Sequence, residues 1–126
     1  MIFLDTHVVI WLYANEIGLL STSAIKAMEE NTLYISPMVL LELQYLYEKP
    51  KPKLKVSEHI ILKFLSQKIG LKVIETNFKA IIEVAKTLTW TRDSFDRIIV
   101  AETQVNHGKL VTKDHHIRQH VQAAIW

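Results

Sequence analysis

The sequence predicts an α/β fold in which a mainly parallel sheet of four or five strands is covered by helices on both faces. Short apolar runs alternate with amphipathic helical segments, an order that favours parallel strands joined by right-handed crossovers. The hydrophobic fraction is 49%, with only three Gly and three Pro, which is typical of a compact, helix-rich chain. The length of 126 residues suits one domain. Since no internal repeat or linker divides it, we expect a single domain over residues 1–126.

The expected strands are short apolar runs bounded by polar or turn residues. Residues 2–5 (IFLD) form an apolar run that ends at a polar residue, as a buried strand does. Residues 32–36, 71–75 and 109–114 have the same character and bring the number of strands to four. The last residues, 123–126, suit an edge strand.

The expected helices have recognisable starts and stops. Ser21 and Ser36 can each accept a hydrogen bond from the first turn of the helix that follows. Gly70 suits a helix end, where glycine adopts the left-handed conformation at little cost. Residues 48–55 carry two prolines and four lysines, which predicts an exposed loop. The predicted helices cover residues 7–14, 21–30, 37–48, 57–69, 77–88, 94–106 and 115–121.

Composition excludes several classes of protein. The absence of cysteine excludes a disulfide framework, a Cys-based zinc site and a thiol nucleophile, and it fits a reducing cytoplasm. The apolar start is interrupted by Asp5 and His7 and has no basic leader, so we expect neither a signal peptide nor a membrane span. The formal charge of +2 is too small to indicate a nucleic-acid-binding protein by itself.

Acidic residues recur at one predicted edge of the sheet. Asp5 ends the first strand, and Asp114 lies just beyond the fourth. Because the carboxyl ends of parallel strands share one edge, the two carboxylates are candidates to meet there. Glu42 lies four residues after Met38 and four before Leu46, on a helix stripe that should be packed. A buried carboxylate is unfavourable unless it is paired, protonated or bound to a metal.

The segment TRDSFDRIIVAE adds two aspartates at the start of a predicted helix. Asp93 suits the N-cap, and Asp96 lies in the first turn, where the helix dipole favours negative charge by about 0.3 to 1 kcal/mol. Capping explains Asp93 well and Asp96 less well, because any polar residue would serve at position 96. A helix that starts at the same sheet edge would point Asp96 toward the other three carboxylates.

Converging carboxylates repel one another unless their pKa values rise or a cation neutralises them. An all-oxygen ligand set, with no cysteine and no evident histidine triad, favours Mg²⁺ or Mn²⁺. Such an ion binds phosphate oxygens and lowers the pKa of a bound water, which suits phosphodiester hydrolysis. Thr6 follows Asp5 directly, and Thr112 lies two residues before Asp114. Each could hydrogen-bond a ligand carboxylate or a metal-bound water, or serve only as a strand or cap residue.

Four motifs in series resemble those of the PIN-domain ribonucleases, and most closely the VapC toxins of bacterial and archaeal toxin–antitoxin pairs. The motifs are FLDTHVVIW at the amino end, Glu42 in the helix after the second strand, RDSFDRIIVAE, and LVTKD near the carboxyl end. The resemblance implies a three-layer α/β/α fold, a Mg²⁺- or Mn²⁺-dependent endoribonuclease, a homodimer, and inhibition by a cognate VapB-type antitoxin.

Matched motif by motif, the resemblance implies that four residues are both metal ligands and catalytic: Asp5, Glu42, Asp96 and Asp114. Asp93 matches an additional aspartate of a DPFDR variant of the family, and it is expected as a cap or as a residue that supports the ligands. Ser94 stands where that variant has proline, and both residue types suit a first helical turn.

Basic residues flank the acidic motifs and are candidates to contact RNA phosphates. Arg92 and Arg97 flank the aspartate pair, and Lys113 and Arg118 flank Asp114. Arg97 could instead pair with an acid. Fifteen basic residues accompany thirteen acidic ones; without the four proposed ligands nine acids remain, and the net charge of the rest is +6. That charge suits an RNA-binding surface.

Other aromatic residues and other function classes remain as alternatives. Trp11, Tyr13, Tyr45 and Tyr47 suit packing or subunit contacts better than a base-stacking platform. A Mg²⁺-dependent phosphatase of the haloacid-dehalogenase type needs a second aspartate two residues after the first, where His7 stands. A PIN-like binding module without activity would keep the same acidic residues, and metal-dependent phosphodiesterase activity would distinguish it from the enzyme.

Overall fold

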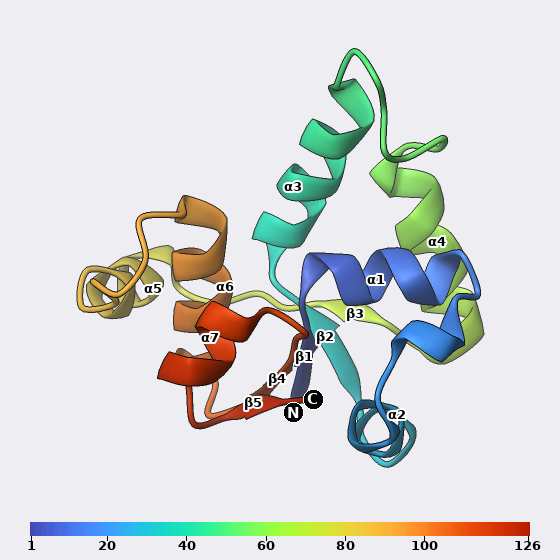
Figure 1. Cartoon of the computed structure of the whole chain (residues 1–126). Coiled ribbons are helices and arrows are strands. Elements are labelled where there is room, and N and C mark those ends of the chain that lie inside the picture. Colours follow the sequence, from blue (N-terminus) through green and yellow to red (C-terminus); the bar gives the residue numbers. More distant parts are fainter.

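The computed structural model describes residues 1–126 as a five-stranded parallel sheet with helices on both sides (Figure 1). The strand order is β3-β2-β1-β4-β5. The strands are β1 (Ile2–Leu4), β2 (Leu33–Ile35), β3 (Lys72–Val73), β4 (Lys109–Val111) and β5 (Ala124–Ile125). The helices are α1 (Thr6–Tyr13), the 3-10 turn η1 (Ile17–Leu19), α2 (Thr22–Glu29), α3 (Pro37–Glu48), α4 (Glu58–Ile69), α5 (Phe78–Ala85), α6 (Ser94–Val105) and α7 (His115–His120).

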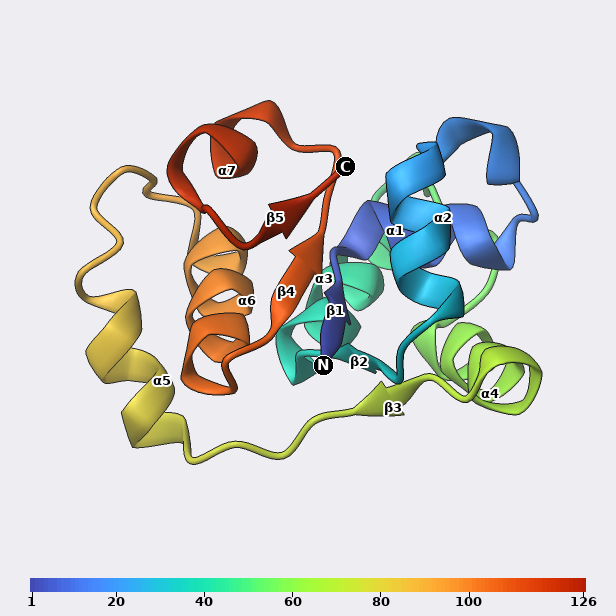
Figure 2. The ribbon, with the colours of Figure 1, turned by 90° about the horizontal axis from the view of Figure 1, so that it is seen from below.

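Two groups of helices enclose the sheet. In Figure 2, α5 and α6 pack together on one side of the strands, and α1, α2 and α4 lie on the other. Helix α3 follows β2 and rises beyond the carboxyl ends of the strands, in contact with both groups (Figure 1). The predicted α/β/α arrangement is confirmed. No helix is both long and apolar enough to cross a membrane.

The central strand β1 forms the middle of the core. Its three residues are all buried, between β2 on one side and β4 on the other. A continuous apolar run is what a parallel strand needs when helices cover both faces. Gly108 stands directly before β4, where a Cβ atom would lie 2.8 Å from the Phe3 ring. Glycine therefore lets β4 approach β1 at this point.

Side-chain caps fix where the helices begin at the carboxyl edge of the sheet. Ser36 Oγ accepts a hydrogen bond from the Met38 amide at 3.1 Å, at the start of α3. Asp93 caps α6, which runs back antiparallel to β4, and Asp114 caps α7. Each cap satisfies amide groups of the first helical turn that have no partner within the helix. Together with α1, which begins directly after β1, four helix starts therefore gather at this edge of the sheet.

Three elements are at least three residues shorter than the sequence predicts. The strand expected over 109–114 ends at Val111, because Asp114 already caps the next helix. The helix expected over 77–88 ends at Ala85, because the next residues turn: the Leu88 amide donates to the Ala85 carbonyl, three residues back. The strand expected over 71–75 contains only Lys72–Val73. β3 is an edge strand that pairs with β2 alone, so fewer ladder bonds extend it.

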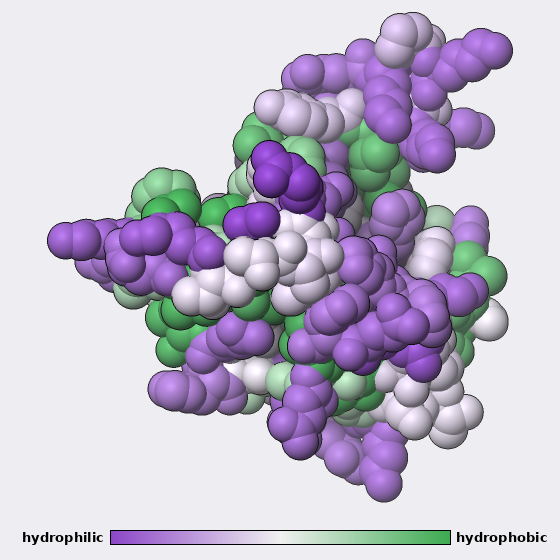
Figure 3. Space-filling view, turned by 60° about the vertical axis from the view of Figure 1, so that its left-hand side comes forward, coloured by the Kyte–Doolittle hydropathy of each residue, from purple (hydrophilic) through white to green (hydrophobic).

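The lysine-rich connection between α3 and α4 is an exposed loop, as predicted, except that Leu54 is buried beneath it. Its lysines, Lys49, Lys51, Lys53 and Lys55, are all exposed. In Figure 3 this loop is part of the hydrophilic projection at the top of the molecule.

Candidate active site

A cavity of about 480 Å³ opens at the carboxyl edge of the sheet, and carboxylates dominate its lining. They come from the end of β1, from α3, from the cap and first turn of α6, and from the segment after β4. The five residues are Asp5, Glu42, Asp93, Asp96 and Asp114. The structure thus brings together all four proposed ligands, together with Asp93.

Asp5 is the most enclosed of these acids. It follows β1 directly, caps α1 and is 9% exposed. Its Oδ1 accepts from the Thr6 amide at 2.8 Å, and its Oδ2 accepts from Thr112 Oγ1 at 2.6 Å. Burial raises the pKa of Asp5, against the opposing effect of these two hydrogen bonds. Both carboxylate oxygens are therefore held in place by donors at the ends of β1 and β4.

Glu42 reaches the same cavity from the second turn of α3. Its Oε1 accepts a hydrogen bond from the hydroxyl of Thr6, which is fully buried. Burial raises the pKa of Glu42, and the charges of Asp5 and Asp93 raise it further. Thr6 binds two acids at once, since its amide serves Asp5 and its hydroxyl serves Glu42.

Asp96, in the first turn of α6, has no compensating partner. No hydrogen bond or ion pair to its carboxylate exists in the structure, and no hydrogen bond lowers its pKa. Burial raises the pKa of Asp96 to about 7, and the neighbouring carboxylates, Asp93 first, add to the rise. A cation in the cavity would stabilise the ionised form of this residue.

Asp93 and Asp114 combine capping with a place at the cavity. Asp93 Oδ1 accepts from the Asp96 amide at 3.1 Å, and Asp114 Oδ1 accepts from the Ile117 amide at 2.9 Å. The amide of Asp114 donates to Thr112 Oγ1 at 3.0 Å, and that hydroxyl donates onward to Asp5. Thr112 therefore fixes Asp5 relative to Asp114.

The donor set of the cavity fits Mg²⁺ or Mn²⁺. The ligands are carboxylate oxygens, and three of these carboxyl groups have pKa values raised by burial and, in part, by one another. No three acidic or histidine side chains lie close enough together to enclose an ion as they stand. Like charges without a counterion are expected to stay apart. The fit to such an ion therefore rests on the chemistry of the donors.

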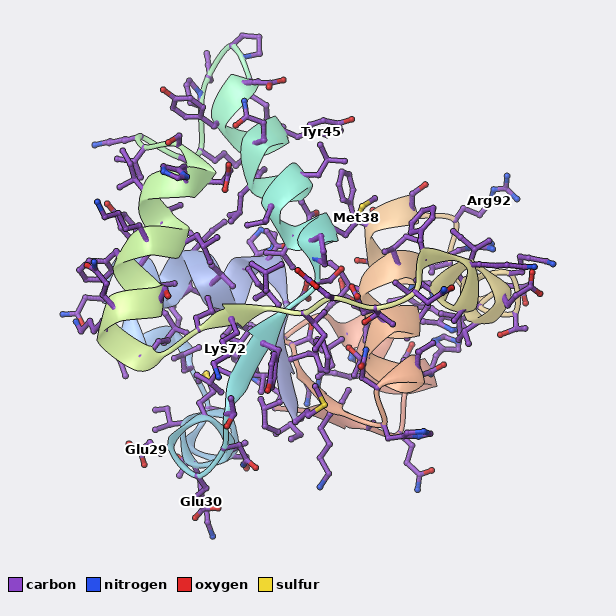
Figure 4. All side chains as sticks on the ribbon, turned by 180° about the vertical axis from the view of Figure 1, so that it is seen from behind. Glu29, Glu30, Met38, Tyr45, Lys72 and Arg92 are labelled. Atoms are coloured by element: carbon purple, nitrogen blue, oxygen red, sulfur yellow. The ribbon has the colours of Figure 1, made fainter.

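Two of the proposed RNA-binding residues are free to meet a ligand, and one of them, Lys113, lies at the cavity. Lys113 lines it, with Nζ 5.8 Å from the centroid of the Trp11 ring. Arg92 is exposed on the segment before α6, and Figure 4 shows its side chain extending into solvent.

The other two proposed RNA-binding residues lie elsewhere. Arg97 Nε donates to the Thr91 carbonyl at 2.7 Å, and its Nη1 donates to the Ala85 carbonyl at 3.4 Å. These bonds tie the α5–α6 loop to α6, so the structure brings Arg97 neither to the cavity nor to an acid. Arg118 is exposed on α7, outside the cavity lining.

Three residues of α1 also line the cavity: His7, Val8 and Trp11. The sequence favours a core or capping role for His7 over one facing the site, and it places neither Val8 nor Trp11 there. A helix that begins directly after Asp5 presents positions 7 and 11, four apart, on one face. This four-residue spacing, directly after a strand-end aspartate, is the signal that could have identified His7 and Trp11.

Comparison with known proteins agrees with this fold. The PIN domain family model matches residues 2–121. Ribonuclease VapC22 of Mycobacterium tuberculosis is 32% identical over 121 residues, which cover 94% of this chain and 91% of that protein.

Solved structures share the fold at low sequence identity. VapBC2 from Rickettsia felis, bound to a DNA fragment from its promoter, has a TM-score of 0.61 at 23% identity and covers 98% of this chain and 96% of its own. A toxin–antitoxin complex from Klebsiella pneumoniae has a TM-score of 0.65 at 16% identity and covers 100% and 97%. The match of the family model over nearly the whole chain, with the VapC relative, shows that this chain belongs to the PIN domain family, among its VapC-type members.

Proposed function

We propose that the protein is a Mg²⁺- or Mn²⁺-dependent endoribonuclease that hydrolyses phosphodiester bonds in RNA. One observation carries the proposal: acids from four distant segments line one cavity, and three of them have raised pKa values there. RNA is the substrate class because the Mycobacterium tuberculosis relative is named a ribonuclease.

Asp5, Glu42, Asp96 and Asp114 would hold the divalent ion. When bound, the ion supplies coordination of phosphate oxygens and a water of lowered pKa. Thr6 and Thr112 orient the first two carboxylates and Asp114 through the hydrogen bonds described above. Lys113 places a positive charge at the cavity wall, where it can receive a backbone phosphate. No side chain is needed as a covalent nucleophile.

The proposal includes partners. The Rickettsia felis neighbour is a VapBC complex and the Klebsiella pneumoniae neighbour a toxin–antitoxin complex, which supports a toxin role with a VapB-type antitoxin. Exposed apolar side chains on α3 and α4, such as Tyr45 (51% exposed) and Phe64 (40%), support a homodimer. We place this activity in the cytoplasm, with RNA as the substrate and no membrane as a partner.

The test is cleavage of a pool of structured RNAs in Mg²⁺ or Mn²⁺, with new ends mapped and EDTA as a control. Asp96→Asn removes the charge that lacks a partner. Glu30→Gln is the matched control, because it changes an exposed acid at the opposite, amino edge of the sheet. We expect discrete cuts from the unaltered protein and from Glu30→Gln only. Undiminished metal-dependent cleavage by Asp96→Asn contradicts the assignment, and metal binding without any cleavage supports an inactive binding module.

A further inference from the structure

An aromatic group forms one wall of the acidic cavity. Trp11 lines the cavity and is partly exposed. Its ring centroid lies 6.0 Å from that of Trp126 and 6.1 Å from that of His7. The side chain is partly buried against the core, and it also lines the cavity. A large flat surface therefore lies beside five carboxylates.

A positive charge accompanies this ring. Lys113 Nζ lies over the Trp11 ring, 5.8 Å from its centroid, and both residues line the same cavity. Lys113 has no carboxylate partner within ion-pair distance. Lys113 is exposed, so its side chain can leave the ring to a base. The ring and the ammonium then match one nucleotide, because the base can stack on the ring while its phosphate meets the ammonium.

We propose that Trp11 stacks on an unpaired base next to the bond that is cut, with Lys113 on the adjoining phosphate. The inference rests on the proposed function and names two side chains that hold the substrate beside the acids. A base inside a duplex is already stacked on both faces and cannot offer one to Trp11, whereas bases in loops and single strands can.

The test separates base stacking from binding of the RNA backbone. Asp96→Asn protein, in Mg²⁺, is titrated with a fluorescent single-stranded RNA and with the same strand carrying abasic sites at its central positions. Trp11→Leu keeps an apolar side chain but removes the ring, and Trp11→Phe keeps a ring. Trp90→Leu is the matched control, since Trp90 stacks on His120 at 5.0 Å and does not line the cavity.

We expect the Asp96→Asn protein to prefer the intact strand by about tenfold, the effect of one base stacked on an aromatic ring. Trp11→Leu should abolish that preference, and Trp11→Phe and Trp90→Leu should keep most of it. Lys113→Gln should weaken binding of both strands equally and reduce the salt dependence, as the loss of a phosphate contact does. A residue that only packs would not change the ratio between the two strands.

A preference for the intact strand that persists in folded Trp11→Leu overturns the inference. If Trp11→Leu does not fold, the fluorescence of Trp11 alone is measured after Trp90 and Trp126 are replaced by Phe. Quenching by the intact strand but not by the abasic one supports stacking, and equal quenching overturns it. RNA cleavage that depends on Asp96 distinguishes the two possible failures. If only this inference fails, cleavage is still observed; if the proposed function fails, it is not.

Discussion

The two edges of the sheet carry polar cavities of similar size and different character. The cavity at the amino edge has a volume of about 410 Å³, compared with about 480 Å³ at the carboxyl edge. Lys26, Glu30, His107 and Lys109 line the first, so that charges of both signs occur and all four side chains are exposed. The second is lined by five acids and one lysine, and three of the acids are partly or wholly buried.

The comparison teaches that size does not distinguish a candidate site here, whereas uncompensated charge does. The charged side chains at the amino edge are exposed to solvent, and both signs of charge occur among them. At the carboxyl edge, burial and neighbouring carboxylates raise the pKa values of Asp5, Glu42 and Asp96. A folded chain keeps such an arrangement at a cost in stability, which a bound cation would offset.

The largest expected difference between the two edges is in catalysis. Asp96→Asn should reduce the rate of metal-dependent RNA cleavage by about a hundredfold or more, because it removes charge from the proposed ion site. Glu30→Gln should leave the rate unchanged. Single-turnover cleavage of an end-labelled RNA measures both. Comparable losses in the two variants would remove the distinction between the edges.

The next largest effect is expected at Thr112. Thr112→Val keeps the shape of the side chain but removes the donor to Asp5 Oδ2 and the acceptor for the Asp114 amide. The free energy of unfolding should fall by about 1 to 3 kcal/mol, the cost of leaving buried polar groups unsatisfied. Urea denaturation measures the change, with Thr87→Val, which alters an exposed threonine, as the control. If Thr112→Val leaves the free energy of unfolding unchanged, the hydrogen bond to Asp5 contributes little to stability.

The metal-free protein should become less stable as the pH rises from about 4 to 7. The pKa of Asp96 is about 7 in the folded state against 3.8 as the reference for the unfolded chain, so between these values the folded state binds the extra proton. Stability is therefore highest at the acidic end of the window and is lost toward pH 7. At pH 8, Asp96→Asn should be more stable than the unaltered protein by about 1 kcal/mol.

Denaturation of both proteins across this pH range, without metal and then with Mn²⁺, tests that expectation. The difference between them should shrink below pH 4, and Mn²⁺ should stabilise mainly the unaltered protein. A stability that rises from pH 4 to 7 in the unaltered protein, and equally in Asp96→Asn, would show that Asp96 does not carry the effect.

The smallest effect is expected at the amino edge. Lys109→Gln changes an exposed charge that has no ion-pair partner, so the free energy of unfolding should change by less than about 0.5 kcal/mol. Thermal unfolding with and without Mn²⁺ should give the same metal response as the unaltered protein. If this variant loses the stabilisation by Mn²⁺, the ion binds at the amino edge, which contradicts the proposed site.

Local signals account for what the sequence predicts correctly. Ser21 and Ser36 cap the predicted helices, and the apolar runs become strands in a parallel sheet. Asp5 and Asp114 could be placed at one edge because parallel strands end together. Glu42 could be identified as a candidate from its position alone, because it lies on an otherwise apolar stripe of its helix.

What the sequence does not predict depends on contacts between distant segments. Arg97 donates to the backbone carbonyls of Ala85, at the end of α5, and of Thr91, in the loop that follows, a role that no charge pattern reveals. The double hydrogen bonding of Thr6 to Asp5 and Glu42 requires α1 and α3 to meet. Trp11 was expected to pack, and it does, but its contribution to the cavity wall depends on where α1 lies relative to the acids.

The most direct test of the account is calorimetric titration of Mn²⁺ at pH 6.5, in two buffers of different ionisation enthalpy. Below its pKa of about 7, Asp96 must release its proton when it binds the ion. We expect the unaltered protein to release protons on binding, and Asp96→Asn to bind more weakly and release fewer. Binding of equal affinity in both proteins, with no difference in proton release, would contradict the claim that the buried carboxylates form the metal site.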